Sequence, residues 1–428
     1  MENYMSYLFS AEQEIKNDVG NPLSTYVADS ANLTAFSRMR VSEARLLGDY
    51  RYMYGSGTSI MMNDLTAIGG TLVADQPRNC YIASVTTASG SRVVRQTKKY
   101  HPYTSGTSTL GMITFVMNPG KTNLVQAVGM FDDLNGVFFR MNGLTPEFVI
   151  RKNGVDAEVV SQASWNQSSL SYLDFSKAQI LIIDYQWLGV GRVRVGFVHN
   201  GVPVYGHHFN HSNSVTEVYM NQPSLPFRWE IYNSGATATI SSLMMICASA
   251  YVEGTVGINS FTKAVSTGIA SEVSVAGTQG TTGVALLALK LSDTLLGKPN
   301  RSYDVLKSFS IVTSVDIGYK VVILPDSSKF VTTPTWSAVP GYGWSQYSVG
   351  LNMASGWSTD NNYVVLKDGF AVGASKATAA SVIVDDNPIN AIYQNYDSNN
   401  SQVLAIIAQR LGTTDATCRA SIDWLEIK

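Results

Sequence analysis

Four Asn-Gly dipeptides, which begin at residues 135, 142, 153 and 200, lie within about seventy residues of one another. Both residues of this dipeptide tolerate positive φ, so Asn-Gly favours the two-residue type I′ turns that join antiparallel strands. Short runs of strand-like composition separate these turns, among them MITFVM, GVFFRM, EFVIRK and ILIIDYQW. Turns this closely spaced predict antiparallel meanders, which must form two sheets or a barrel to bury their apolar faces. We therefore expect an all-β chain built on an antiparallel β-sandwich of jelly-roll or concanavalin-like type.

Residues 192–209 contain the clearest hairpin. Apolar and other residues alternate from Arg192 to Phe197 and again from Pro203 to Phe209, with Asn200-Gly201 between the two runs. A two-residue turn would pair His199 with Val202, Phe197 with Val204, Val195 with Gly206 and Val193 with His208. This register predicts an apolar row on one face and, on the other face, Arg192, Arg194, Tyr205 and His207.

The rest of the chain divides into three parts. Residues 1–50 form an N-terminal helix and arm, with the helix predicted over 10–19 and the arm over about 23–50. Residues 51–254 form the sandwich domain, because small polar residues replace the strand pattern after Tyr251. Residues 255–428 form a smaller β-rich domain, in which Asp368-Gly369 marks a hairpin and 420–428 alternates as a strand.

Several sequence segments point to one family. Residues 184–194 read DYQWLGVGRVR, and Gly196-Phe197, Gly201 and the run 208–211 (HFNH) follow at fixed spacing. Further matches are AFSRMRVSE at 35–43, VRQTKKYHPY at 94–103, GMFDDLNGVFFR at 129–140 and SLP at 224–226. Over about residues 30–255 the chain resembles virion structural proteins of tailed phages, especially aquatic ones, and of large DNA viruses. It departs from them at Ser37 and Ala44, where members of that group usually have Gly and Pro.

The resemblance implies a non-enzymatic virion structural protein in a symmetric assembly, as a fibre, spike, head decoration or vertex protein. Its partners would be copies of itself, with a trimer favoured by analogy to viral appendages, and other virion proteins. Such a protein is found in the virion and assembles in the host cytoplasm. The alternative is a receptor- or carbohydrate-binding module of the particle, which would contact a host surface glycan or receptor.

Composition agrees with a surface made for contact with neighbouring copies. Only 14% of residues are charged, against about 25% in a typical protein. The net charge of −2 is scattered along the chain, which argues against nucleic-acid binding. No run approaches the roughly 18 apolar residues of a membrane span, and the N-terminus lacks the basic start of a signal peptide. The three cysteines are far apart, which predicts buried free thiols.

Histidine supplies the main candidate for metal binding. His199, His207, His208 and His211 lie within thirteen positions, and imidazole is a common metal ligand. The predicted register places His207 on the face opposite His199 and His208, so we expect structural or interface roles and no metal site. Arg192 and Arg194 either face solvent or are covered, and in the second case Asp184 is the expected counter-charge.

Catalytic motifs fail at residues that their chemistry needs. Gly120-Lys121-Thr122 lacks the first glycine of a phosphate-binding loop, and Arg194 occupies the third glycine position of a dinucleotide fingerprint. The carboxylates that could serve glycoside hydrolysis are more simply turn or loop acids: Asp132, Asp133, Glu217, Asp385 and Asp386. We expect no enzymatic activity and no cofactor.

Aromatic loops in the C-terminal half supply the candidates for recognition. Trp344 and Trp357 follow glycine in loops with the appearance of exposed tips. Tryptophan offers rigid contact area and stacks on sugar rings, although the same residues could pack a core or a subunit interface. The candidate interface or recognition residues are therefore Arg192, Arg194, Tyr205, His207, Trp344 and Trp357.

Overall fold

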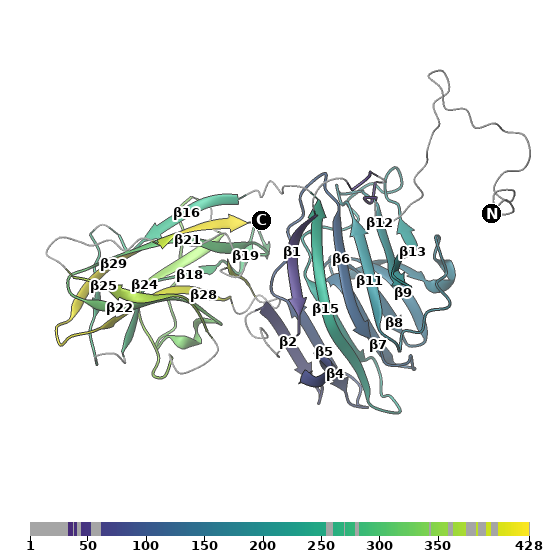
Figure 1. Ribbon diagram of the computed structural model, residues 1–428, viewed down its shortest axis with the longest axis horizontal. Coiled ribbons are helices and arrows are strands. Elements are labelled where there is room, and N and C mark those ends of the chain that lie inside the picture. Colours follow the sequence, from purple (N-terminus) through teal and green to yellow (C-terminus); the bar gives the residue numbers. More distant parts are fainter. Residues whose placement is uncertain are drawn as a thin grey trace, which may run out of the picture.

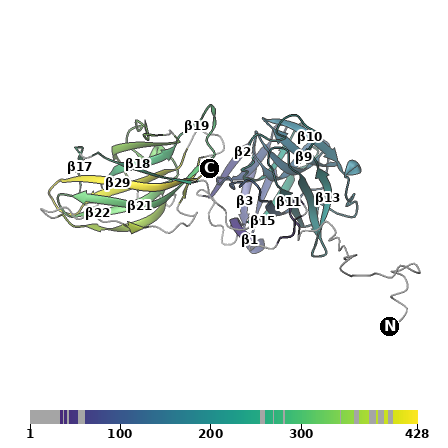
Figure 2. The same cartoon turned by 90° about the horizontal axis from the view of Figure 1, so that it is seen from above.

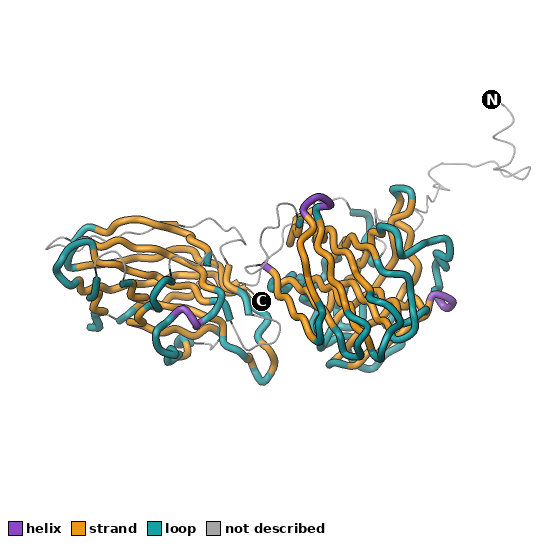
Figure 3. Tube along the Cα trace, turned by 90° about the horizontal axis from the view of Figure 1, so that it is seen from below, coloured by secondary structure: helices purple, strands orange, loops and turns teal. Residues whose placement is uncertain are grey.

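The computed structural model consists of two β domains, which lie end to end in Figures 1 and 2. It describes residues 33–36, 38–40, 44–52, 61–253, 260–268, 270–278, 282–341, 344–357, 363–373, 382–383, 391–394 and 401–427. Strands dominate both domains (Figure 3). The predicted helix at 10–19 lies outside the described residues. Within the described residues, no helix is long and apolar enough to cross a membrane.

The first domain is an antiparallel sandwich of an eight-stranded and a seven-stranded sheet. The eight-stranded sheet contains β13 (Val202–Phe209), β12 (Val193–His199), β11 (Gln179–Tyr185), β6 (Thr109–Val116), β15 (Ser241–Glu253), β4 (Cys80–Val85), β3 (Thr71–Asp75) and, beside β15, β1 (Ala44–Arg51). The seven-stranded sheet contains β10 (Val155–Ser161), β9 (Thr145–Lys152), β8 (Gly136–Asn142), β7 (Leu124–Phe131), β14 (Phe227–Asn233), β5 (Arg92–Thr97) and β2 (Met62–Ala67). Phe139 of one sheet meets Phe197 of the other edge to face, with ring centroids 5.1 Å apart. The fold class predicted from the turns is confirmed.

The second domain repeats this construction with two six-stranded sheets. One sheet contains β16 (Ser260–Ser266), β29 (Ala416–Ile427), β21 (Tyr303–Thr313) and β26 (Val382–Ile383), with β17 (Val273–Val275) on β29 and β27 (Ala391–Ile392) on β21. The other contains β23 (Ser337–Ala338), β24 (Ser345–Asn352), β18 (Gly283–Leu291), β28 (Val403–Arg410), β22 (Ile317–Leu324) and β25 (Val364–Ala371). A small hairpin of β19 (Thr294–Leu295) and β20 (Lys298–Pro299) extends from this domain toward the first one (Figures 1 and 2).

Two predictions for the chain ends and hairpins need correction. Residues 44–51, predicted as part of the arm, form β1 and pair antiparallel with β15. Asp368-Gly369 is not a turn, because both residues lie inside β25 and pair with Lys320 and Tyr319 of β22. The closing segment does form a strand, β29, between β16 and β21. The cysteines are free as expected, although Cys247 is partly exposed while the other two are buried.

The Asn-Gly dipeptides lie at four connections between paired strands, which are β7–β8, β8–β9, β9–β10 and β12–β13. Asn153-Gly154 forms a two-residue turn in which the φ values are 50° at Asn153 and 80° at Gly154. Asn200-Gly201 forms another, with φ values of 50° at Asn200 and 76° at Gly201. The other two dipeptides begin at Asn135 and Asn142, where β8 begins and ends. Turn chemistry therefore correctly indicated the meander β7 to β10.

The hairpin β12–β13 contains a β-bulge that alternation did not predict. His199 pairs with Val202 and Phe197 with Val204 as expected, but Val195 pairs with His207 and Val193 with Phe209. The register shifts because Gly206 is the additional residue opposite the β12 strand. A Cβ atom at Gly206 would lie 2.9 Å from the Trp165 ring and 3.2 Å from the Phe148 ring.

The bulge exchanges the faces of two histidines. His208 shares the outer face with Tyr205, with ring centroids 5.8 Å apart, whereas His207 contacts the ring of Phe209 at 4.5 Å. The prediction that His207 accompanies Arg194 and Tyr205 is therefore wrong, since a bulge of one residue reverses every side chain beyond it.

His101 is a fully buried histidine between the two sheets of the first domain. Its Nδ1–H donates to the Leu225 carbonyl at 2.8 Å, and its Nε2 lies 3.1 Å from the Tyr50 hydroxyl. Gly48 makes room for this ring, because a Cβ at Gly48 would lie 2.6 Å from Nε2. Burial, helped by the charge of Lys99, lowers the pKa of His101 from 6.5 to about 3.

The pKa of His101 predicts acid sensitivity. Between pH 6.5 and about 3 the unfolded chain binds a proton at His101 that the folded chain does not, so the free energy of unfolding falls as the pH falls. We expect His101→Gln to reduce this pH slope by up to about 1.4 kcal/mol per pH unit in urea titrations at a series of pH values. The partly exposed His199 provides the control, His199→Gln, and equal slopes for the two variants would contradict the assignment.

Candidate functional site

The motif segment 184–194 builds a buried ion-pair network on the outer face of the eight-stranded sheet. Asp184 of β11 lies directly opposite Arg194 of β12, and both side chains are fully buried and paired. The second partner of the Asp184 carboxylate is Arg40, at 2.8 Å, and the Ser108 hydroxyl donates to it at 2.6 Å. The prediction that Asp184 neutralises a covered arginine is confirmed.

This Asp184 network also holds residues 33–40 against the sheet. Arg194 donates to the Leu33 carbonyl at 2.6 Å, and Arg192 donates to the Ala35 carbonyl. Arg40 bridges Asp184 and Glu253, at 2.8 and 2.7 Å. The described part of the N-terminal segment is thus fixed by charge-assisted hydrogen bonds.

Tyr205 completes the network. The guanidinium carbon of Arg194 lies 4.3 Å from the centroid of the Tyr205 ring, a cation–π arrangement. Arg194 and Tyr205 are both buried, so this face is covered and is not a solvated strand surface. The motif residues therefore anchor the chain to itself and leave no open site at this position.

The four histidines do not converge. The His199 ring lies beside the tilted ring of Tyr172 near the turn, with centroids 4.4 Å apart, and His207 Nδ1 lies 3.3 Å from the Asn166 backbone nitrogen. His211 stacks on Tyr219 at 4.0 Å, and its Nε2 lies 2.8 Å from Glu158. Within the described residues, no three metal-ligating side chains come together.

The aromatic loops are buried, contrary to the prediction of exposed tips. Trp344 is 8% exposed and Trp357 is 3% exposed. Trp357 belongs to an apolar cluster with Phe330 and Leu351. Backbone hydrogen bonds fix Trp344, whose carbonyl accepts from Ser292 N at 2.7 Å and from Asn300 Nδ2 at 2.9 Å. The Trp357 ring therefore packs in an apolar cluster of the second domain, and Trp344 is largely buried just before β24.

A cavity of about 250 Å³ opens on the outer face of the seven-stranded sheet. We call it the sheet-face pocket. Its lining residues alternate with core residues along β5, β7, β8, β9 and β14, and they are Arg92, Val125, Ala127, Phe131, Phe138, Arg140, Arg151, Glu230 and Tyr232. Sequence reasoning missed this site, although each of these strands except β7 contains at least one charged residue.

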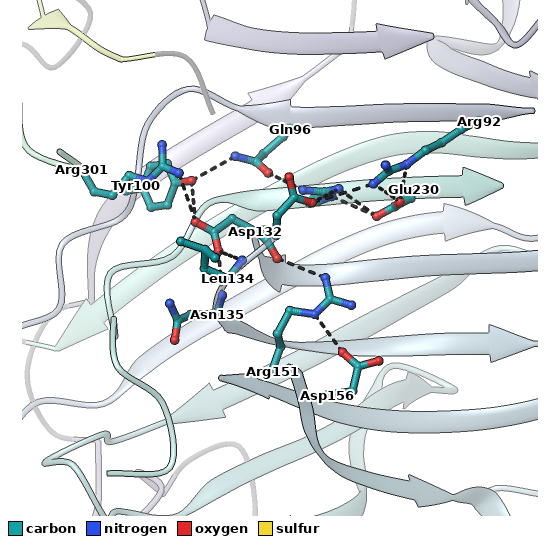
Figure 4. A network of polar contacts seen from close by, with 12 residues as sticks. Arg92, Gln96, Tyr100, Asp132, Leu134, Asn135, Arg151, Asp156, Glu230 and Arg301 are labelled. Atoms are coloured by element: carbon teal, nitrogen blue, oxygen red, sulfur yellow. Dashed lines mark hydrogen bonds and ion pairs between the residues drawn. The ribbon is translucent and has the colours of Figure 1, made fainter. Parts of the chain in front are cut away.

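Every guanidinium around the sheet-face pocket is paired with a carboxylate. Arg92 lies 2.5 Å from Glu230 (Figure 4), and Arg228 lies between Glu230 and Asp133, at 3.0 and 2.8 Å. Arg140 contacts Glu147 and Asp156 at 2.7 and 2.5 Å. Such a network is electrically balanced.

Asp156 of this face lacks the raised pKa that glycoside hydrolysis requires of one carboxyl group. A glycosidase needs one carboxyl group whose pKa is raised, so that it can protonate the leaving oxygen. Burial would raise the pKa of Asp156, but hydrogen bonds and charge from Arg151 and Arg140 outweigh burial and lower it. Glu217, another sequence candidate, is exposed and paired with Lys152, and Asp385 and Asp386 lie outside the described residues.

The turn Asp132–Asn135 connects this face to the second domain. Asp132 accepts from the Tyr100 hydroxyl at 2.9 Å and faces Arg301 of the second domain at 3.5 Å, as Figure 4 shows. The guanidinium carbon of Arg301 lies 4.6 Å from the centroid of the Tyr100 ring. Asp132 is therefore part of the contact between the domains, while its neighbour Asp133 pairs with Arg228.

A larger cavity of about 450 Å³ lies between the two domains. We call it the interdomain pocket. The first domain contributes Asp132, Leu134, Asn135, Asn153, Asn221 and Gln222, and the second contributes Leu295, Leu296, Lys298, Pro299, Asn300, Arg301, Ser302 and Trp344. Of the sequence candidates for recognition, only Trp344 lines this cavity.

No family model and no curated protein matches the sequence. Solved structures with similarity to it include a β-1,3-glucanase from Mycobacterium marinum, with 12% identity, a TM-score of 0.34, and coverage of 48% of this chain and 98% of that one. A legume lectin-like domain from Entamoeba histolytica shows 11% identity, a TM-score of 0.29, and coverage of 46% and 91%. A protein of unknown function from Shewanella oneidensis MR-1 shows 10% identity, a TM-score of 0.33, and coverage of 54% of this chain and 97% of that one. Similarities at this level carry no argument about ligand or reaction.

The Asp184 network predicts a large effect on stability. Asp184→Asn leaves the buried Arg194 without its counter-charge, which we expect to lower the free energy of unfolding by about 3 kcal/mol or more. Urea denaturation measures this change. Glu217→Gln is the control, since Glu217 is 76% exposed and an exposed pair contributes about 1 kcal/mol at most. Similar losses in both variants would contradict a structural role for the network.

Proposed function

We propose that this chain is a non-enzymatic structural subunit of a virus particle, assembled in the host cytoplasm as a fibre, spike, head decoration or vertex protein. The observation that carries the proposal is the role of the segment that resembles virion proteins. Asp184, Arg192 and Arg194 are used to fix the chain's own N-terminal segment to the sheet. Their contribution is thus mechanical, as expected of a building block.

Surface chemistry supports association with further copies. Among the described strands, β25 forms one edge of its sheet, and edge strands present backbone groups to a partner. On and beside this edge Phe370 is 74% exposed, and Val365 and Val372 are also exposed. An apolar edge on a chain with few charges favours burial against a second copy, and a trimer is the proposed state.

Two measurements test the structural proposal. Mass spectrometry of purified particles is expected to detect the chain as a virion component, and light scattering on the purified protein is expected to give the mass of a trimer. Phe370→Asp should shift that mass toward the monomer, because a charge at the edge opposes apolar association. A protein that stays monomeric at high concentration and is absent from particles would refute the proposal.

A second candidate function is carbohydrate recognition by the same particle. The observation that favours it is the interdomain pocket, which combines side-chain amides with apolar side chains and Trp344. Pockets that bind small polar molecules share this combination of apolar walls and a few convergent polar groups.

An array of printed oligosaccharides tests this second function. We expect the purified protein to bind a subset of them above background and to release no new reducing ends from them. A blank array would refute carbohydrate recognition, whereas new reducing ends would show that the protein is a hydrolase.

A further inference from the structure

We propose that the interdomain pocket is the carbohydrate site and that its ligand is a neutral saccharide. This inference rests on carbohydrate recognition, the second function proposed above. Its volume of about 450 Å³ lies within the range of roughly 300–1,000 Å³ found for ligand pockets, which often lie between domains.

Side-chain amides supply the polar groups. Asn221 Nδ2 donates to Asn153 Oδ1 at 2.6 Å, which leaves the Oδ1 of Asn221 and the Nδ2 of Asn153 for a ligand. Within the described part of the chain, the Gln222 amide makes no hydrogen bond to protein. These three amides offer both donors and acceptors, as hydroxyl groups require.

Asn221 is held in place before any ligand arrives. The Asn221 backbone nitrogen donates to Asn135 Oδ1 at 3.0 Å, and Asn135 is itself fixed by a bond from its own backbone nitrogen to Asp132 Oδ1 at 2.7 Å. A site whose supporting hydrogen bonds are already formed loses little conformational freedom on binding.

The opposite wall carries apolar groups that suit the C–H face of a sugar ring. Trp344 and Leu295 come from the second domain, and Leu296 stands at the tip of the β19–β20 hairpin with 95% of its surface exposed. Leu296 also has a φ of 51°, a conformation that costs energy for a leucine. This φ belongs to the two-residue turn Leu296-Gly297, and the exposed side chain of Leu296 is the part of the wall that a ligand can cover.

Charge balance favours a neutral ligand. The two buried charged groups of the pocket, Asp132 and Arg301, face each other at 3.5 Å, and the third charged group of its lining, Lys298, is exposed. At the sheet-face pocket, by contrast, a ligand must compete with carboxylates for each arginine. When a ligand binds between the domains, the free amide groups exchange hydrogen bonds to water for hydrogen bonds to the ligand, and no protein ion pair is broken.

The test is an array of neutral and acidic oligosaccharides probed with the full chain and four variants. Leu296→Asp and the double variant Asn221→Ala/Gln222→Ala are expected to weaken binding to neutral members at least tenfold. Leu144→Asp and Asn210→Ala are expected to bind as the unaltered chain does. Leu144 is a matched control, since it is 73% exposed in the turn between β8 and β9.

The outcomes separate the site from the function. Binding that survives both pocket variants refutes the interdomain site and leaves carbohydrate recognition standing. Binding confined to acidic oligosaccharides refutes the neutral ligand, and a blank array refutes the function itself. Because Asp tolerates positive φ, Leu296→Asp is expected to fold, and an unchanged unfolding midpoint in urea confirms that the loss is local.

Discussion

The first domain depends on one requirement, which is that a guanidinium removed from water must be paired. Arg194 meets that requirement through Asp184 on the neighbouring strand, and the remaining capacity of the Asp184 carboxylate is taken by Ser108 and Arg40. The network therefore joins β11 and β12, the residue before β6 and the N-terminal segment. Removing Asp184 leaves the buried Arg194 without its counter-charge, so these elements stabilise one another cooperatively.

Local patterns in the sequence predicted the local structure. The errors in the prediction arise where contacts between residues distant in sequence determine the strand register. Alternation and Asn-Gly turns were sufficient for the antiparallel sandwich and for the pairs next to Asn200-Gly201. The bulge at Gly206 was not predictable in this way, because it depends on the rings of Trp165 and Phe148, which reach it only in the folded domain. The face of His207 was wrong for the same reason.

The candidate sites show the same division between features set by neighbouring strands, which could be predicted, and features set by the tertiary fold, which could not. The pairing of Asp184 with Arg194 followed from adjacent strands, and so it could be predicted. Glycine-rich surroundings suggested exposed tips at Trp344 and Trp357, but burial of these rings depends on how the second sandwich closes at its ends. The arginines of the sheet-face pocket lie on three different strands, β5, β8 and β9, and only the sheet order brings them together. An interdomain pocket depends on how two domains dock, and the periodicity of the strands does not predict that docking.

The turn Asp132–Asn135 explains how two pockets with different chemistry can be neighbours. Its adjacent acids point to different partners, since Asp133 pairs with Arg228 on the sheet face and Asp132 faces Arg301 of the second domain. Asp133 thereby helps to neutralise the sheet face, and Asp132 neutralises the buried cation of the interdomain pocket, Arg301. What then remains of the pocket lining is mainly amide and apolar surface, with the exposed Lys298 as its one further charged group. That surface can bind a ligand without displacing a protein ion pair, and this difference in cost is the physical reason to place recognition between the domains.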